Sequence, residues 1–369
     1  MDAIRIQDRP IGPGHPAFLI AELSANHLQD LEIALQTIRA AADCGADAVK
    51  LQTYTPDTIT LDCRRECFLI RQDSPWKGMY LYDLYRQAFT PWDWQERLFA
   101  EARRLGLVCF ASVFDPSSVD FLEPLGCPAY KIASFEIGDL PLIGYAASRK
   151  KPVLLSTGIA TQEEIGEAME VCRAAGNPQI ALLKCTSAYP APLESVHLRT
   201  MADMAARFDV PVGVSDHTLG CSVAVASVAL GACIVEKHLI LRKSLGGPDA
   251  AFSIEPEEFR AMARGIREVE KALGCATYEL TPGQVASRSH ARSLFAVADI
   301  RAGEPLTRDN VRSIRPADGL PPRHLTEILG RKACIDIPRG TPLQWEMIEP
   351  PHPGSPLSPS PSDGQEELP

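Results

Sequence analysis

The fold of this chain is decided by Val214-Ser215-Asp216-His217-Thr218 and, further along, by Val235-Glu236-Lys237-His238. Each stretch is a short apolar run that ends in charged residues and a histidine. Between them, residues 219–231 are small and apolar enough for a buried helix that stops at Gly231. The order predicts strand, helix, strand, and a right-handed crossover brings both strand ends to one side of a parallel sheet. Two imidazoles there can share one metal ion, although a lone histidine more often only caps a strand.

Length and composition are those of an ordinary globular protein. The chain has 369 residues, 45% hydrophobic and 23% charged, which is enough for a large core and a small second domain. A net charge of -10 disfavours nucleic acid and anionic membranes as partners, so an anionic substrate must be met by a local basic cluster. The 11 cysteines are irregularly spaced and several lie in apolar runs, which predicts reduced thiols in a cytoplasmic protein. No stretch predicts a membrane span or a signal peptide.

An alternation of strands and helices runs through most of the chain. The expected strands are 18–23, 47–52, 107–112, 129–133, 153–156, 180–185, 212–215 and 233–237. Helix starts are marked by Thr90-Pro91, by Asp115-Pro116 and by a capping box over Thr161–Glu164. Eight strands, each followed by a helix-sized segment, predict an α/β protein with a (β/α)8 TIM barrel. A doubly wound open sheet is the alternative, but the first strand lacks a glycine-rich dinucleotide turn.

Breaks in this alternation predict the domain organisation. The expected parts are an irregular lead-in (1–16), the barrel (17–275), a linker (276–290), a small β-rich domain (291–349) and a disordered tail rich in Pro, Ser and Glu (350–369). The connection over residues 53–90 is too long for an ordinary loop. Connections of this size are usually lids or interface elements, with a plain surface insertion as the alternative.

Polar side chains gather where the expected strands end. In a TIM barrel the active site lies at the carboxyl ends of the strands. The polar residues expected on this rim are Glu22, Lys50, Gln52, Ser112, Asp115, Lys131, Ser134, Glu136, Ser156, Thr157, Lys184, Thr186, Ser187, Ser215, Asp216, His217, Glu236, Lys237 and His238. One such residue could be a solvated strand end, but a whole set on one rim indicates an active site.

The side chains of this rim suggest their chemistry. A basic, hydroxyl-rich pocket for a phosphate or a carboxylate would be formed by Lys50, Lys131, Lys184, Ser134, Ser156 and Ser215. His217 and His238 suit a divalent metal that also accepts oxygen ligands. Two histidines without a pair of thiolates argue against a closed structural zinc site. Glu22 is a candidate acid or base, because a buried carboxylate beside lysines can be tuned in either direction. The residues therefore predict a metal-assisted reaction between a phosphorylated anion and a second small molecule.

From about residue 17 to 349 the chain resembles the sialic acid synthase family. The motifs that carry the resemblance are Ile20-Ala21-Glu22-Leu23-Ser24-Ala25-Asn26-His27, Ala48-Val49-Lys50-Leu51-Gln52, Tyr130-Lys131-Ile132-Ala133-Ser134, Leu155-Ser156-Thr157-Gly158, Cys185-Thr186-Ser187-Ala188-Tyr189-Pro190, Ser215-Asp216-His217-Thr218 and Glu236-Lys237-His238. Within the family it most resembles the branch that makes pseudaminic acid. This narrower match is carried by residues 52–58, 76–85, 131–136 and 247–253.

The resemblance implies a specific reaction. Phosphoenolpyruvate condenses with an open-chain N-acetylated amino sugar and water, giving a nine-carbon 2-keto acid and phosphate. In the pseudaminic acid branch the sugar is 2,4-diacetamido-2,4,6-trideoxy-L-altrose. The implied catalytic residues are Glu22, Lys50, His217 and His238, and the two histidines would hold Mn²⁺, with Mg²⁺ or Co²⁺ as alternatives. The implied substrate contacts are Lys131, Ser134, Ser156, Ser187 and Ser215 for phosphoenolpyruvate, and Gln52, Tyr189 and Asp249 for the sugar.

The resemblance also implies a domain-swapped homodimer. The C-terminal domain would be an antifreeze-like SAF (β-clip) domain placed over the partner's barrel. Arg315, in Ile314-Arg315-Pro316, would reach the partner's sugar site. The chain departs from the family pattern at Ser187, where the sialic acid branch has asparagine. It departs again at Ala111 and Val113, where Ser and Pro are usual, and this weakens the expected contact from Ser112.

Three other functions stay open. An N-acetylneuraminate or legionaminate synthase would share the metal and phosphoenolpyruvate sites and differ in the sugar pocket. A Schiff-base aldolase would use Lys131 or Lys184 as its nucleophile, and the two-histidine site argues against it. A non-catalytic sugar-phosphate-binding or ice-binding protein is suggested only by the terminal domain.

Overall fold

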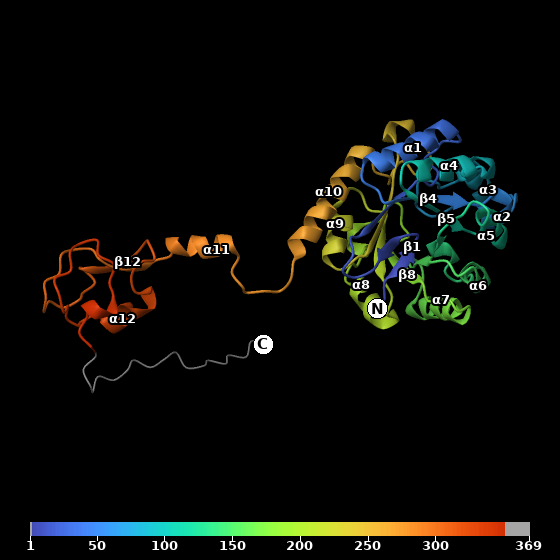
Figure 1. Ribbon diagram of the computed structural model, residues 1–369. Coiled ribbons are helices and arrows are strands. Elements are labelled where there is room, and N and C mark those ends of the chain that lie inside the picture. Colours follow the sequence, from blue (N-terminus) through green and yellow to red (C-terminus); the bar gives the residue numbers. More distant parts are fainter. Residues whose placement is uncertain (1, 351–369) are drawn as a thin grey trace. The chain divides into compact units, whose positions relative to one another are not determined.

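The computed structural model describes residues 2–350 (Figure 1). They form two compact units, which divide between Gly274 and Cys275. The tail expected after residue 350 lies outside the described residues. No helix in the described part of the chain is long and apolar enough to cross a membrane.

The first unit contains a closed barrel of parallel strands in sequential order. The strands are β3 (Phe18–Glu22), β4 (Ala48–Thr53), β5 (Val108–Val113), β6 (Tyr130–Ile132), β7 (Val153–Ser156), β8 (Ile180–Cys185), β9 (Val212–Asp216) and β10 (Ile234–His238). β10 pairs with β3 to close the ring, with Ile234 opposite Phe18 and His238 opposite Glu22. The TIM barrel is therefore confirmed and the open sheet is excluded. Every strand bound lies within one residue of the bound expected from the sequence.

Helices surround the barrel, as Figure 1 shows. They are α1 (Leu31–Asp43), α4 (Trp92–Arg104), α5 (Pro116–Leu122), α6 (Leu140–Ser148), α7 (Gln162–Ala174), α8 (Thr200–Phe208), α9 (Ser222–Ala229) and α10 (Pro256–Leu273). Side chains fill the inside of the barrel and helices cover the outside, so the strands are buried on both faces, and all five residues of β3 are buried.

Helix boundaries follow the expected signals with two exceptions. Asp115 caps α5 through the backbone N–H groups of Ser117 and Ser118. The capping box that starts at Thr161 is present. Thr90 does not cap α4, because its hydroxyl lies 3.3 Å from His27 Nε2 instead. The helix expected over 219–231 is shorter in the structure. α9 begins only at Ser222, and Leu219, which was expected to be buried in it, is 61% exposed.

Two segments of the first unit have more structure than the sequence predicts. The lead-in over residues 1–16 is not irregular throughout but holds an antiparallel hairpin of β1 (Ile4–Ile6) and β2 (Arg9–Ile11). Alternation of Ile and Arg in β1 buries both isoleucines and leaves Arg5 exposed. The connection over 53–90 contains α2 (Pro56–Ile59), η1 (Glu66–Phe68) and α3 (Leu81–Ala88). Single 3-10 turns follow three of the barrel strands: η2 (Ser134–Glu136), η3 (Leu193–Ser195) and η4 (Lys243–Leu245).

The second unit has its own small apolar core. Its two-stranded sheet pairs β11 (Ser293–Ala296) antiparallel with β12 (Val311–Ile314). The other elements are α11 (Pro282–Ser287), η5 (Arg288–His290), η6 (Pro322–His324), α12 (Leu325–Ile328) and η7 (Trp345–Met347). α11 and η5 occupy the segment expected to be a linker. The core is built from buried side chains such as Leu294, Ile300, Leu306 and Leu343.

Candidate active site at the carboxyl ends of the barrel strands

Strand alternation sorts the polar side chains onto two faces of the barrel. Thr53 marks the outer face of β4, because its hydroxyl bonds to Gln95 on α4 at 2.8 Å. Lys50 has the opposite parity and therefore points into the barrel. By the same parity and their mutual contacts, the inner set comprises Glu22, Lys50, Gln52, Ser112, Lys131, Ser156, Ser215, Glu236 and His238.

Lys50 is the centre of the inner set. Its ammonium Nζ lies 2.7 Å from Glu22 Oε2 and 3.6 Å from Glu236 Oε1. It also donates to Ser112 Oγ at 2.9 Å. The side chains of Lys50, Glu22 and Glu236 are at most 4% exposed. One buried ammonium therefore faces two buried carboxyl groups and a hydroxyl.

The two carboxyl groups around Lys50 have different proton affinities. Burial raises the pKa of Glu22 to about 7, against the opposing effect of Lys50, and the charge of Glu236 adds to the rise. For Glu236, burial is outweighed by Lys50 and Lys131, so its pKa lies below the ordinary value. Glu22 can therefore take up or release a proton near neutral pH, which suits a general acid or base, whereas Glu236 stays ionised.

Lys131 forms the basic end of the pocket. Its Nζ donates to Ser156 Oγ at 2.6 Å and to the backbone oxygen of Ile132 at 3.2 Å. Nearby, the hydroxyls of Ser134 and Ser187 lie 2.6 Å apart. Burial lowers the pKa of Lys131, and Glu236 only partly offsets this effect. An anion bound here would supply the charge-assisted contacts that favour the ammonium form.

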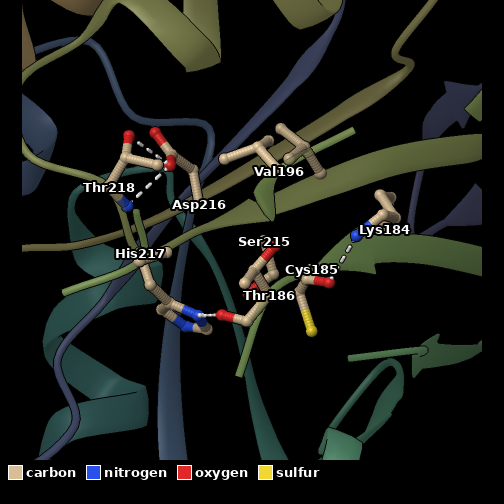
Figure 2. Close-up of a pocket in the computed structure, with 10 residues that line it drawn as sticks. Lys184, Cys185, Thr186, Val196, Ser215, Asp216, His217 and Thr218 are labelled. Carbon is tan, nitrogen blue, oxygen red and sulfur yellow. Dashed lines mark hydrogen bonds between the residues drawn. The ribbon is translucent and has the colours of Figure 1, made fainter. Parts of the chain in front are cut away.

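The two histidines lie side by side. His217 directly follows β9 and His238 is the last residue of β10, and their ring centroids are 5.3 Å apart. His217 Nδ1 lies 3.1 Å from the backbone oxygen of Thr186, a contact drawn in Figure 2. A carbonyl only accepts, so Nδ1 carries the proton and Nε2 keeps its lone pair. Burial lowers the pKa of His217 to about 4, and burial followed by the charge on His217 lowers that of His238.

These two neutral imidazoles fit an open metal site. The described residues contain no group of three or more His, Cys, Asp or Glu side chains placed to hold a metal ion. His238 Nδ1 is nevertheless buried without a hydrogen-bond partner among the described residues, and Asp249 Oδ2 lies 3.8 Å away. Each neutral imidazole keeps a lone pair on one ring nitrogen, and two such nitrogens side by side are a donor set that water and substrate oxygens can complete.

A chain of hydrogen bonds links Asp249 to Glu22. Gln52 Nε2 donates to Glu22 Oε1 and to Ser24 Oγ, both at 2.9 Å. Ser24 Oγ in turn donates to Asp249 Oδ2. Ser24 has a positive φ of 45°, which turns the chain sharply after β3. The sequence did not predict Ser24 as a site residue, because its role depends on the contact with Asp249, far away in the chain.

Aromatic rings line the mouth of the barrel beside the histidines. Tyr189 lies 4.5 Å from His217 between ring centroids, and Phe252 lies 4.9 Å from His238. Trp76, from the 53–90 connection, lies 5.4 Å from Tyr189, and its Nε1 donates to the backbone oxygen of Pro248 at 2.8 Å. The long connection therefore reaches the candidate site.

Glu136 lies in η2, just beyond β6, as expected. Its Oε2 is buried and has no hydrogen-bond partner among the described residues. Burial raises the pKa of Glu136 to about 7, with Lys131 opposing the rise. A buried carboxyl oxygen without a partner is available to a bound substrate.

Two expected substrate contacts point away from the barrel interior. Asp216 and Lys184 have the opposite parity to their inward neighbours Ser215 and Cys185. Asp216 accepts from the backbone N–H and hydroxyl of Thr218, and Lys184 Nζ donates to the backbone oxygen of Cys185 at 2.7 Å (Figure 2). Neither side chain therefore shares the inner face with Lys50 and Lys131, because position at a strand end does not by itself decide which face a side chain occupies.

Glu236 and Arg315 complete the comparison with the sequence. Glu236 was expected on the rim of strand ends but was given no catalytic or binding role, and its spacing of two from His238 on one strand puts both on the same face. Ser215 Oγ donates to Glu236 Oε1 at 3.0 Å. Arg315 lies in the second unit, exposed, directly after β12.

Comparison with known proteins matches family profiles to both units of the chain. The NeuB family profile matches residues 37–278 and the SAF domain profile matches residues 291–349. The chain is 44% identical to a pseudaminic acid synthase of Campylobacter jejuni over 89% of this chain and 95% of that one. It is 45% identical to the pseudaminic acid synthase of Helicobacter pylori over 90% and 98%. Among solved structures, an N-acetylneuraminic acid synthetase of Leptospira borgpetersenii gives a TM-score of 0.70 at 28% identity, over 78% and 95%.

The fold and the site define a TIM-barrel protein with a buried cluster of lysine, serine and glutamate side chains and a histidine pair at the carboxyl ends of its strands, followed by a SAF domain. The chain belongs to the NeuB family.

Proposed function

We propose that this protein is an enzyme that condenses phosphoenolpyruvate with an open-chain N-acetylated amino sugar, and that its product is pseudaminic acid. The observation that carries this proposal is the inner cluster in which Lys50 and Lys131 lie among the carboxyl groups of Glu22 and Glu236, beside two neutral imidazoles. The choice of 2,4-diacetamido-2,4,6-trideoxy-L-altrose as the sugar is supported by the identity of 44% to a pseudaminic acid synthase.

Lys131 and the serine hydroxyls beside it bind phosphoenolpyruvate in this proposal. Burial lowers the pKa of Lys131, because a buried ammonium charge is unfavourable in the free protein. The negative charge of the bound anion offsets this unfavourable burial. Ser134, Ser156, Ser187 and Ser215 offer hydroxyls that rotate to donate to phosphate or carboxylate oxygens. The charge-assisted contacts fix the enol carbon in the barrel.

Carbon–carbon bond formation follows from this placement. The methylene carbon of phosphoenolpyruvate attacks the aldehyde carbon of the sugar, and the aldehyde oxygen takes up a proton to become a hydroxyl. The phosphate-bearing carbon of phosphoenolpyruvate then has oxocarbenium character, and water attacks it. Glu22, with a pKa of about 7 and held by Lys50 and Gln52, accepts the proton that water loses. Cleavage of the bond between that carbon and the phosphate oxygen, with transfer of the new hydroxyl proton to the departing phosphate, releases phosphate and leaves the 2-keto acid.

A divalent ion, with Mn²⁺ preferred, is proposed at His217 and His238. When bound, it would polarise the sugar aldehyde and lower the barrier to attack. His217 is oriented for this task by Thr186, which fixes the tautomer that leaves Nε2 free. Gln52, Tyr189, Asp249 and Glu136 surround the place where the sugar would lie.

We further propose a cytoplasmic homodimer in which Arg315 completes the partner's sugar site. All 11 cysteines lie among the described residues and are free thiols, which fits a reducing compartment. Arg315 is exposed and has no part in the core of its own unit, so its guanidinium is available to the carbonyl of an N-acetyl group.

The decisive experiment measures phosphate release from phosphoenolpyruvate against a panel of amino sugars. The altrose derivative should give the highest kcat/KM, with N-acetylmannosamine and the legionaminic acid precursor far behind. Treatment with EDTA should abolish turnover and Mn²⁺ should restore it. Preference for another sugar would reassign the branch of the family, and a trapped borohydride adduct on Lys131 would indicate an aldolase.

A further inference from the structure

A buried ion pair lies behind the two histidines, on the outer face of the barrel. Lys237 Nζ is 2.7 Å from Asp216 Oδ2, and the side chains are 0% and 1% exposed. Asp216 directly precedes His217, and Lys237 directly precedes His238. Because successive side chains of a strand point to opposite faces, the pair cannot face the substrate cavity that Ser215 shares with Glu236. None of the steps proposed above uses it.

Asp216 and Lys237 both hydrogen-bond to Thr218, in the turn that contains His217. Asp216 Oδ1 accepts from the backbone N–H of Thr218 at 2.9 Å and from its hydroxyl at 2.8 Å. Lys237 Nζ also donates to the backbone oxygen of Thr218 at 2.5 Å. The backbone oxygen of His217 itself accepts from the N–H of Ala191 at 2.9 Å. The residues on both sides of His217 are therefore tied to the neighbouring strand.

The surroundings leave Asp216 to balance the charge of Lys237. Glu258, on α10, is the other carboxylate whose charge interacts with Lys237. Its Oε2 is held by Lys243 at 2.9 Å. A buried ammonium that loses its counter-ion is strongly unfavourable, so the two side chains must stay together in the folded protein.

We propose that the Asp216–Lys237 pair is a positioning device that sets the distance and orientation of the two imidazoles relative to each other. The proposal rests on the proposed function, since it takes both histidines to hold one metal ion. A salt bridge between adjacent strands fixes the position of one strand backbone relative to the other, and fully satisfied buried polar networks are rigid. Removal of groups that orient metal ligands typically weakens metal affinity by about 10- to 100-fold.

The test uses a double variant, Asp216→Asn with Lys237→Met, in the full-length protein. It removes both charges and keeps the volume, so neither charge is left buried alone, and the barrel should fold with a near-native melting temperature. We expect its Kd for Mn²⁺, measured by calorimetry after chelator treatment, to rise by about 10- to 100-fold. Asp216→Glu, which keeps the charge but lengthens the arm, should fold and give a smaller rise.

A second readout needs no metal. In the ¹⁵N-histidine spectrum of the metal-free protein, the Nδ1 proton of His217 is protected by its bond to Thr186. We expect this proton to exchange with solvent at least about tenfold faster in the double variant, since local opening sets such rates. The matched control is Arg267→Met. It breaks an ion pair with Asp47 of 2.9 Å at the opposite end of the strands, and should lower stability without moving either readout.

The outcomes separate this inference from the proposed function. A folded double variant with unchanged Mn²⁺ affinity and unchanged proton exchange would overturn the inference. If the unaltered protein bound no Mn²⁺, the metal assignment would fail, and the inference would fail with it as a statement about metal ligands. Proton exchange would then still decide whether the pair orders His217.

Discussion

At the scale of single residues, burial controls the chemistry of the site. Lys131, Glu22 and the two histidines all have proton affinities displaced from their ordinary values, and burial is the largest cause in each case. These altered pKa values suit catalysis. A histidine that stays neutral keeps a lone pair, and a carboxyl group with a pKa of about 7 exchanges protons at neutral pH.

Lys131→Ala should weaken phosphoenolpyruvate binding far more than folding. Loss of one charge-assisted contact costs about 1.5–3 kcal/mol, so KM for phosphoenolpyruvate should rise roughly ten- to a hundredfold. Steady-state kinetics with saturating sugar measure this. Lys184→Ala is the matched control, because Lys184 points away from the interior and its loss should change KM little. Equal effects of the two substitutions would contradict the anion pocket.

His27 should make the protein less stable in acid. Burial lowers its pKa from 6.5 to about 4. The folded state therefore prefers the neutral ring, so the stabilisation is present above pH 6.5 and is lost as the pH falls towards 4. The loss over that window is about 3 kcal/mol. Guanidinium unfolding of the wild type and of His27→Gln, at pH 7 and pH 4 with chelator present, should give a smaller drop in the variant. Parallel drops would refute the assignment.

At the scale of elements, one segment of the long connection over 53–90 reaches the catalytic end of the barrel through Trp76. Trp76 contacts Tyr189 and Phe252, with ring centroids 5.4 and 6.2 Å apart, and bonds to the backbone of Pro248. Most of its neighbours in residues 71–78 are exposed. The order of this segment should therefore depend on the tryptophan.

Trp76→Ala should release the segment over residues 71–78 from the barrel. Two ring contacts and a hydrogen bond contribute about 1 kcal/mol each, so local opening should become at least about tenfold more frequent. Limited trypsin digestion should then cut faster at exposed basic residues such as Arg71 and Lys77, while the melting temperature of the barrel changes little. Tyr82→Phe, on α3, removes only a hydroxyl whose bond to Asp57 is exposed, so it is the control and should leave the cleavage rate unchanged. Unaltered digestion of the Trp76 variant would count against this role.

At the scale of the whole molecule, the two units divide the work in our proposal. The barrel carries the groups that bind the anion and the metal, whereas the SAF domain offers Arg315. Neither unit would then condense the sugar by itself, and activity would require two copies of the chain.

Mixed dimers test this division. His217→Ala and Arg315→Ala should each be inactive alone for the condensation. After subunit exchange, a mixed dimer should regain part of the activity, up to one of its two sites, because both defects fall on the same site and leave the other intact. Phosphate release by the mixture measures the recovery, and native mass spectrometry verifies the exchange. No recovery despite verified exchange, or a fully active monomer, would exclude composite sites.

The sequence by itself determined the barrel and much of its rim. Alternating strand and helix signals placed all eight strands, since apolar periodicity and capping are local properties. Family motifs pointed to Glu22, Lys50, Lys131 and the histidine pair. The sequence did not predict the hairpin at residues 4–11, because its isoleucines are buried only by contacts made in the folded chain.

Only the tertiary structure decided which face each polar residue occupies and what it touches. Asp216 and Lys184 end strands like their neighbours but point outward, whereas Glu236 points inward to Lys50. Ser24 matters through Asp249, more than two hundred residues away in the chain. Trp76 reaches the barrel mouth through contacts that no local pattern contains. The physical reason is that strand ends are set by short-range preferences, while orientation, burial and pKa depend on neighbours that closure of the barrel brings together.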